Sequence, residues 1–153
     1  MKARDIMTRT VVTVKPETTI EELAKILAEH RISGAPVIDV DGSLVGMVTE
    51  KDLIRKDARL HIPTVFRIFD AIIHIEKPGR LLDEMRRMAA TEVGDICTDE
   101  VITLGPDASL SEIATIMSEK NVAPIPVIED GKIICIIGKV DVVRAMAAGN
   151  DGT

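Results

Sequence analysis

The segment Thr49-Glu50-Lys51-Asp52 brings a hydroxyl, an amine and a carboxylate together within four residues. It lies where an aliphatic run ends and a helical pattern begins, so free backbone N–H groups and the positive end of a helix dipole favour a phosphate there. The Asp52 carboxylate can accept hydrogen bonds from the 2′ and 3′ hydroxyls of a ribose, and Lys51 is near enough to neutralise a phosphate. The same Thr-x-x-Asp spacing also describes an ordinary helix N-terminus with a capping Thr and an acidic first turn. Both interpretations stand at this point.

The chain is an internal duplication, which is the most informative feature of the sequence. Asp5-Ile6-Met7-Thr8 returns ninety positions later as Asp95-Ile96-Cys97-Thr98. The second copy lacks a residue equivalent to Val40, after which the offset becomes 89 and Asp52 aligns with Asp141. Positions 5–55 without Val40 give 17 identities in 50 pairs, whereas chance gives about three.

Each copy has the same pattern of secondary structure. Apolar residues recur at helical spacing in 20–27 and again in 110–117, and Thr19 and Ser109 are the expected N-caps. Two short strands follow in each copy, at 36–40 and 44–49 and then at 125–128 and 133–137, around Asp-Gly turns. Second helices are expected at 50–58 and 139–148, the latter closed by Gly149.

These elements predict an α+β (α/β) fold with two tandem units of β-α-β-β-α type. One small sheet cannot bury its apolar face alone, so the units should pack sheet to sheet with pseudo-two-fold symmetry. The expected divisions are a first unit at 1–58, an inter-repeat insertion at 59–92, a second unit at 93–149 and a C-terminal tail at 150–153. Within the insertion, 63–69 and 78–90 are expected to be helices and 71–75 a short strand.

Composition excludes several classes of partner. The net charge of −6 and the pI of about 5.1 leave no basic surface for nucleic acid, and Phe66 and Phe69 are the only aromatic residues on which bases could stack. The apolar runs are too short to cross a membrane, and the N-terminus does not resemble a signal peptide. Cys97 and Cys135 form no metal or redox pattern and are expected to be small buried hydrophobes. We therefore expect a cytoplasmic protein without nucleic-acid or membrane partners.

The chain also lacks the usual signatures of catalysis. No Ser-His-Asp or Cys-His grouping, P-loop or glycine-rich dinucleotide turn is present. His30, His61 and His74 stand apart from one another and from any cysteine at zinc-ligand spacing. We expect no enzymatic activity, no metal and no resident cofactor.

The string Asp5-Ile6-Met7-Thr8, followed by Pro36-Val37-Ile38-Asp39, Gly46-Met47-Val48-Thr49 and Asp52, resembles the CBS domain, and the second copy carries a more degraded version. The resemblance covers nearly the whole chain except the insertion. It implies a disc of two CBS units with two clefts that bind AMP, ADP, ATP or S-adenosylmethionine, a regulatory role toward an unidentified protein, and a homodimer. The alternative is a structural or dimerisation module without a ligand, because some members of the family bind nothing known.

The resemblance also implies the residues of each cleft. Thr49, Lys51 and Asp52 would face the segment Val122-Ala123-Pro124, which would form an apolar bed for adenine. The opposite cleft would combine Asp141 with Ile32-Ser33-Gly34. The two clefts are expected to be unequal, because the first copy keeps Gly46, Thr49 and Asp52, whereas the second has Cys135 and Gly138 at the first two positions and retains only Asp141.

Overall fold

The computed structural model describes residues 1–57 and 90–150. The strand and helices expected within the insertion lie outside these residues, except for residue 90, the last of the helix expected at 78–90, which is not helical. All of the expected tail except residue 150 also lies outside them. The first repeat contains α1 (Ala3–Ile6), α2 (Ile20–His30), β1 (Gly34–Ile38), β2 (Leu44–Thr49) and α3 (Glu50–Asp57). The second contains the short 3-10 helix η1 (Val93–Asp95), α6 (Leu110–Lys120), β3 (Ile125–Glu129), β4 (Lys132–Ile137) and α7 (Lys139–Asn150).

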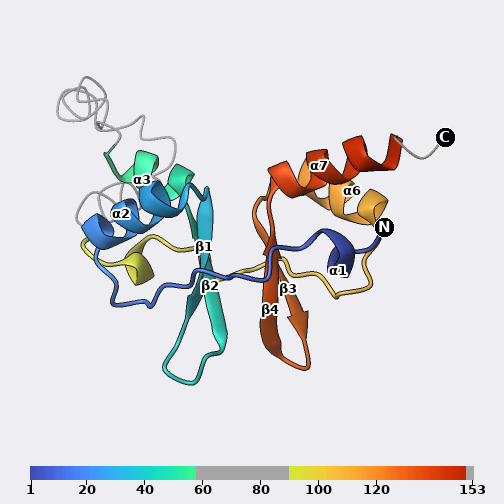
Figure 1. Ribbon diagram of the computed structural model, residues 1–153. Helices are drawn as coiled ribbons and strands as arrows, with labels where there is room; N and C mark the ends of the chain where they lie inside the picture. Colours follow the sequence, from blue (N-terminus) through green and yellow to red (C-terminus); the bar gives the residue numbers. More distant parts are fainter. Residues whose placement is uncertain (58–89, 151–153) are drawn as a thin grey trace, which may run out of the picture.

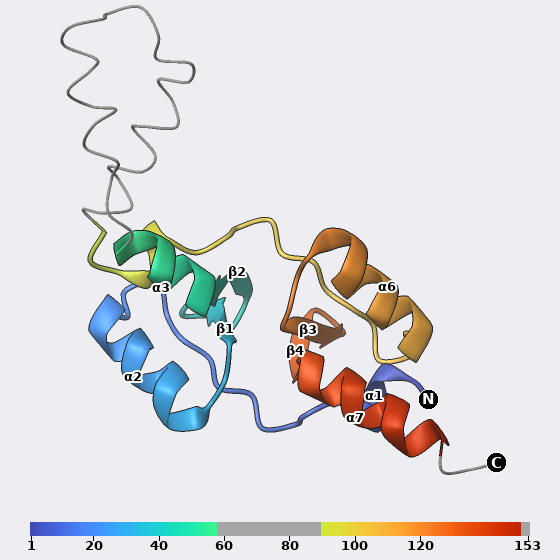
Figure 2. The same ribbon diagram turned by 90° about the horizontal axis from the view of Figure 1, so that it is seen from above.

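Two antiparallel hairpins, β1–β2 and β3–β4, stand side by side in the middle of the molecule (Figure 1). Helices α2 and α3 accompany the first hairpin, and α6 and α7 the second. The four helices lie on one side and the hairpin turns on the other, so Figure 2 looks onto the helical side. The first strand expected in each unit is reduced to one parallel bridge, Val14–Val37 in the first repeat and Leu104–Val127 in the second. With that difference, the predicted fold class is confirmed.

Helix boundaries follow from local chemistry. Thr19 Oγ1 and Ser109 Oγ accept hydrogen bonds from the backbone N–H groups of Glu22 and Glu112, as predicted. Helices α2 and α6 then end at equivalent positions, where Arg31 and Asn121 adopt left-handed conformations with φ of 52° and 51°. The prediction that Gly149 closes α7 was wrong, because the helix continues to Asn150.

The extra residue Val40 changes the first hairpin turn. In the second hairpin Asp130 and Gly131 both have positive φ, of 50° and 77°, as a tight two-residue turn requires. In the first hairpin only Gly42 does, with φ of 80°. The strand expected at 36–40 ends at Ile38 instead, because Asp39 Oδ1 accepts hydrogen bonds at 2.9 Å from the backbone N–H groups of Asp41 and Ser43 and begins the turn.

The residues that the structure describes form two apolar cores, and each core takes a segment from the other repeat. The first core contains Leu23, Val37 and Val48, together with Val93 and Ile96 from the start of the second repeat. The second core is formed by helices and strands of the second repeat together with N-terminal residues of the first, which are Ala3, Ile6, Met7 and Val11. Figure 1 shows the N-terminal segment crossing from α1, beside the second hairpin, to α2. The two sequence repeats are therefore interlocked in space.

Two glycines permit close approach where the repeats meet. A Cβ atom on Gly34 would stand 2.9 Å from Pro124 Cδ and from the Val48 carbonyl oxygen. Gly34 and Pro124 are equivalent positions of the duplication, so their contact lies at the pseudo-two-fold axis. A Cβ on Gly46 would stand 2.9 Å from Sγ of Cys97, which belongs to the part of the second repeat that packs on the first core.

Candidate functional site

A cavity of about 710 Å³ lies between the repeats. It is lined by both strand-to-helix junctions and by the segments that precede β1 and β3. It is also lined by the segments 8–12 and 98–102, here called the crossing segments, each of which pairs with a strand of the other repeat. All ten site residues expected from the sequence are among the lining residues: Ile32, Ser33, Gly34, Thr49, Lys51, Asp52, Val122, Ala123, Pro124 and Asp141. The two expected clefts are thus joined in one continuous cavity. Gly46, which the sequence pattern grouped with Thr49 and Asp52, does not line the cavity. A glycine is needed there because Cys97 packs against it.

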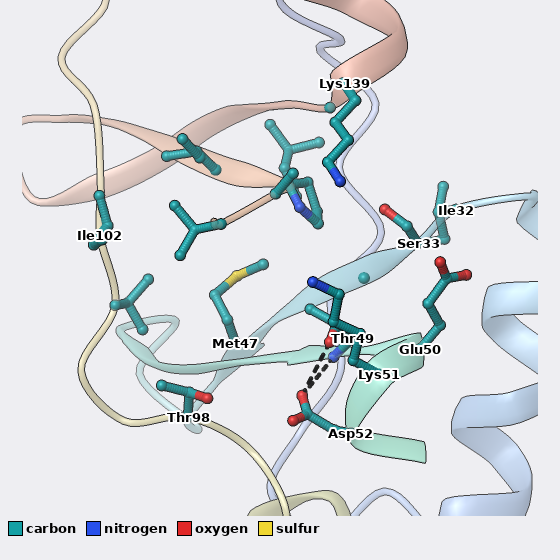
Figure 3. A pocket seen from close by; sticks show the side chains of 18 of the residues that line it. Ile32, Ser33, Met47, Thr49, Glu50, Lys51, Asp52, Thr98, Ile102 and Lys139 are labelled. Atoms are coloured by element: carbon teal, nitrogen blue, oxygen red, sulfur yellow. Dashed lines mark hydrogen bonds between the residues drawn. The ribbon is translucent and has the colours of Figure 1, made fainter. Parts of the chain in front are cut away.

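At the first junction, the Asp52 carboxylate caps α3 through one oxygen. Its Oδ2 accepts hydrogen bonds from the Thr49 backbone N–H at 2.8 Å and from Thr49 Oγ1 at 3.3 Å (Figure 3). Among the residues of 1–57 and 90–150, none donates a hydrogen bond to Oδ1. Asp52 therefore serves as a helix cap and also offers a carboxylate oxygen at the cavity.

At the second junction both oxygens of Asp141 have a neighbour. Oδ2 accepts a hydrogen bond from the Gly138 backbone N–H at 2.8 Å. Oδ1 lies 3.4 Å from the hydroxyl of Thr8, which donates to it, and 3.7 Å from Arg144 Nη1. A ligand that used Asp141 Oδ1 would compete with these contacts.

The crossing segments contribute residues that the sequence analysis did not assign to the site. Thr98 exchanges two backbone hydrogen bonds of 2.8 Å with Met47, and Thr8 pairs in the same way with Ile136 on β4. One signal could have revealed the threonines, since they end the Asp-Ile-x-Thr motif in both copies. The apolar residues of the cavity had no such signal, because ordinary core residues have the same pattern: Val12, Met47, Val101, Ile102, Ile125 and Ile136.

Of the residues that the structure describes, eight with ionisable side chains line the cavity, four of each sign. The cations are those of Arg31, Lys51, Arg55 and Lys139, and the anions are those of Glu50, Asp52, Glu100 and Asp141. Within the part of the chain that the structure describes, no two of these eight form an ion pair. Figure 3 shows Lys51 and Lys139 entering the cavity from the two repeats, and Glu50 beside Ser33 and Ile32. Polar groups and apolar walls together suit a ligand with a flat ring, hydroxyls and a charged group.

The two cysteines are free thiols, as expected. Burial raises the pKa of Cys135 to about 11. Burial also raises the pKa of the half-buried Cys97, and the negative charge of Asp52 adds to this shift. Both thiols stay protonated at neutral pH and behave as small hydrophobes.

Residues 1–57 and 90–150 contain no group of three or more His, Cys, Asp or Glu side chains placed to hold a metal ion. None of the helices in these ranges is long and apolar enough to span a membrane.

Three comparisons place this architecture among known proteins. An uncharacterized protein of Methanocaldococcus jannaschii, MJ1426, is 27% identical over 95% of this chain and 91% of its own length. The inosine-5'-monophosphate dehydrogenase of Korarchaeum cryptofilum is 32% identical over 92% of this chain, which spans only 23% of the length of that enzyme. A crystal structure of CBSX2 from Arabidopsis thaliana in complex with AMP superimposes with a TM-score of 0.77 at 26% identity, over 96% of this chain and 97% of the other.

The family model for the CBS domain matches twice, at residues 3–59 and 93–148. Both matches fall on the copies of the duplication, and the structure of each copy has the helices and hairpin described above. The chain belongs to the CBS domain family and is a CBS domain pair.

Proposed function

We propose that this chain is a regulatory module that binds an adenosine-containing ligand in the cavity between its two CBS units. The observation that carries the proposal is the convergence on one cavity of Asp52, Asp141 and the segments 32–34 and 122–124, which lie far apart in the sequence. At the Asp52 junction, the carboxylate oxygen to which no described residue donates a hydrogen bond suits ribose hydroxyls, and Lys51 suits a phosphate. The AMP bound by CBSX2 makes AMP the first candidate, with ADP, ATP and S-adenosylmethionine next.

A regulatory role without catalysis fits the residues that surround the cavity. Among the described residues that line it, the ionisable side chains are all of Arg, Lys, Asp or Glu, and neither Cys97 nor Cys135 is one of the lining residues. The dehydrogenase relative joins a homologous segment to an enzyme within one longer chain. By analogy, ligand binding here would shift a conformational equilibrium that is felt by a regulated protein.

Thermal unfolding with AMP, ADP, ATP, S-adenosylmethionine and NADH tests the proposal. A ligand present at 100 times its dissociation constant adds about 2.7 kcal/mol to the free energy of unfolding. We expect one or more adenosine compounds to raise the melting temperature, and NADH to do so least. Unchanged melting with every compound would favour the alternative function. Turnover of ATP or AMP that is lost in Asp52→Ala would contradict the non-catalytic role.

The alternative function, a dimerisation module without a ligand, is favoured by apolar side chains on the helical side of the molecule. Ile54 on α3 and Val143 on α7 are equivalent positions of the duplication and are 68% and 65% exposed, and Met146 is 47% exposed. Leu53 and Val142, on the same two helices, instead pack against their own cores. We propose that a second copy covers these residues, whether or not the cavity binds a ligand.

Sedimentation equilibrium at micromolar concentration tests the dimer. We expect twice the monomer mass for the wild type and the monomer mass for Val143→Glu, because a charge placed in an apolar interface is costly to bury. Lys132→Glu, a charge change on the hairpin of the second repeat, is the matched control and should remain dimeric. A monomeric wild-type protein would rule out this proposal.

A further inference from the structure

The cavity has the same pseudo-two-fold symmetry as the chain that encloses it. Twenty-four of the twenty-seven described residues that line it form twelve pairs of equivalent positions in the duplication. Gly34 and Pro124 are one such pair, and their contact lies at the pseudo-two-fold axis. The axis therefore passes through the cavity, which consists of two equivalent halves in one continuous space.

Each half offers the groups that an adenosine needs. Asp52 and Asp141 are an identical pair, and so are Thr8 and Thr98. A ligand with one adenosine uses one half of such a cavity, whereas a ligand with two identical halves uses both. Three further pairs are apolar in both repeats and suit the flat face of an adenine ring: Val12 with Ile102, Ile32 with Val122, and Met47 with Ile136.

The charged groups of the whole cavity favour a negatively charged link between the two adenosines. Once Asp52 and Asp141 bind the two riboses, the other charged residues that line the cavity have an excess of cations. Arg144, which does not line the cavity but lies 3.7 Å from Asp141 Oδ1, adds to this excess. Lys51 and Lys139 enter the cavity from the two repeats, so each repeat supplies a lysine for a chain of phosphates (Figure 3). The cations that line the cavity are Arg31, Lys51, Arg55 and Lys139, and the remaining anions are Glu50 and Glu100.

A joined ligand also has an advantage over two separate nucleotides in a continuous cavity. The phosphates of two separate nucleotides share one space and repel each other. In a joined ligand the first adenosine holds the second at an effective concentration of about 1 mM, so the second one binds without a new loss of translational freedom. The half beside Asp141, where Thr8 competes for the carboxylate, is then occupied as well.

We propose that the cavity binds a single ligand in which two adenosines are joined through their 5′ oxygens by a chain of phosphates. One adenosine lies beside Asp52 and the other beside Asp141. The inference rests on the proposed function, and it adds the class of ligand that fills both halves of the cavity.

Calorimetry with diadenosine triphosphate, tetraphosphate and pentaphosphate tests the proposal, because a linker must match the span between two sites. Adenosine 5′-tetraphosphate is the matched control, since it carries the same number of phosphates as diadenosine tetraphosphate but only one adenosine. We expect one diadenosine compound per chain. At least one of the three should bind about tenfold or more tightly than adenosine 5′-tetraphosphate. One diadenosine compound per two chains would contradict the proposal, because the ligand would then join two protomers.

Asp141→Ala distinguishes a ligand that uses both halves from one that uses a single half. This variant should bind AMP nearly as the wild type does, but its affinity for the diadenosine compound should fall to that for adenosine 5′-tetraphosphate. Asp52→Ala should weaken both AMP and the diadenosine compound. Glu129→Ala, which removes a carboxylate on the second hairpin outside the cavity lining, is the control and should change neither. Asp141→Asn keeps an oxygen that can accept the hydrogen bond from the Gly138 N–H, and it replaces Asp141→Ala if melting shows that the latter is unfolded.

Two outcomes separate this inference from the proposed function. If the wild type binds AMP, but none of the diadenosine compounds binds more tightly than adenosine 5′-tetraphosphate, the inference is wrong and the proposed function stands. The same holds if folded Asp141→Ala or Asp141→Asn binds the diadenosine compound as tightly as the wild type does. If neither AMP nor any other adenosine compound binds the wild type, the proposed function fails and the inference fails with it.

Discussion

At the residue scale, Asp52 and Asp141 differ in how many of their carboxylate oxygens are engaged. Both use Oδ2 to cap a helix, through hydrogen bonds of 2.8 Å from the backbone N–H of Thr49 or Gly138. Asp141 also has a hydroxyl and a guanidinium near Oδ1, whereas no described residue donates a hydrogen bond to Oδ1 of Asp52. The helix-cap and ligand interpretations of Thr-x-x-Asp are therefore compatible in one residue.

We predict that the cavity binds AMP more strongly beside Asp52 than beside Asp141. The second repeat has Gly138 in place of Thr49 and so lacks one hydroxyl, whose hydrogen bond typically contributes about 0.5–1.5 kcal/mol, or up to about tenfold in affinity. A ligand at Asp141 must in addition displace Thr8. Calorimetry should show AMP binding largely lost in Asp52→Ala and largely retained in Asp141→Ala. The opposite pattern would reverse the assignment.

Cys135 gives a second residue-scale prediction, on pH. Its pKa in the folded protein is about 11, above the value of 9.0 expected for an unburied thiol. The folded state thus favours the neutral thiol, so its contribution to stability is complete below pH 9 and is lost as the pH rises from about 9 to 11. The free energy of unfolding should fall across this range by about 1–2 kcal/mol more in the wild type than in Cys135→Val. Parallel pH curves for the two proteins, measured by urea unfolding, would show that the thiol does not contribute.

At the scale of elements, equivalent caps begin equivalent helices. Thr19 begins α2 and Ser109 begins α6 through the same backbone hydrogen bond, at 3.2 Å and 3.1 Å. Each cap satisfies a backbone N–H that the helix itself leaves unpaired. The two helices pack against different cores, so each cap reports on one half of the molecule.

Replacing either cap should destabilise the protein by a similar amount. We expect Thr19→Ala and Ser109→Ala each to lower the free energy of unfolding by about 1 kcal/mol. Thr19→Ser and Ser109→Thr keep the hydroxyl and should cost much less. Urea unfolding measures all four variants. Equal stability of the Ala and hydroxyl-bearing variants at either position would show that the cap there does not stabilise the fold.

At the scale of the whole molecule, the crossing segments and the Gly34–Pro124 contact hold the repeats together around the cavity. The crossing segments tie each β-hairpin to the start of the other repeat, through Met47–Thr98 and Thr8–Ile136. Lys2 and Arg4 also reach Asp107 in the second repeat, with distances of 3.2 Å and 2.7 Å to Oδ1. These pairs are exposed and contribute little to stability by themselves.

We predict that Gly34→Ala loosens the contact at the pseudo-two-fold axis. Its new methyl group would stand 2.9 Å from Pro124 Cδ and from the Val48 carbonyl, which is closer than van der Waals contact. Overpacking of this kind costs about 1–3 kcal/mol. AMP affinity should fall together with stability, because the same residues line the cavity. Gly105→Ala, where no atom lies within 4 Å of the added Cβ, is the control and should change neither.

The sequence by itself determined the duplication, the order helix, hairpin, helix within each copy, and the family. Helices and tight turns depend on interactions between residues a few positions apart, so Thr19 with Glu22 and Asp130 with Gly131 were readable from local patterns. The junction at Thr49 and Asp52 was readable for the same reason. The end of β1 was misplaced, because the Asp39 side chain starts a turn inside an aliphatic run. The end of α7 was also misplaced, because the helix continues past Gly149.

Only the tertiary structure decided how the two repeats share their cores and their cavity. Val93 and Ile96 of the second repeat enter the first core, and Ala3 and Ile6 of the first repeat enter the second core. This exchange depends on packing between residues that are distant in the chain. An apolar residue has the same local sequence pattern whichever core it enters. For the same reason, only the tertiary structure explains why position 46 requires a glycine: a Cβ there would collide with Cys97. Side-chain chemistry and spacing are properties of the sequence, but which charges meet around one cavity is a property of the folded pair.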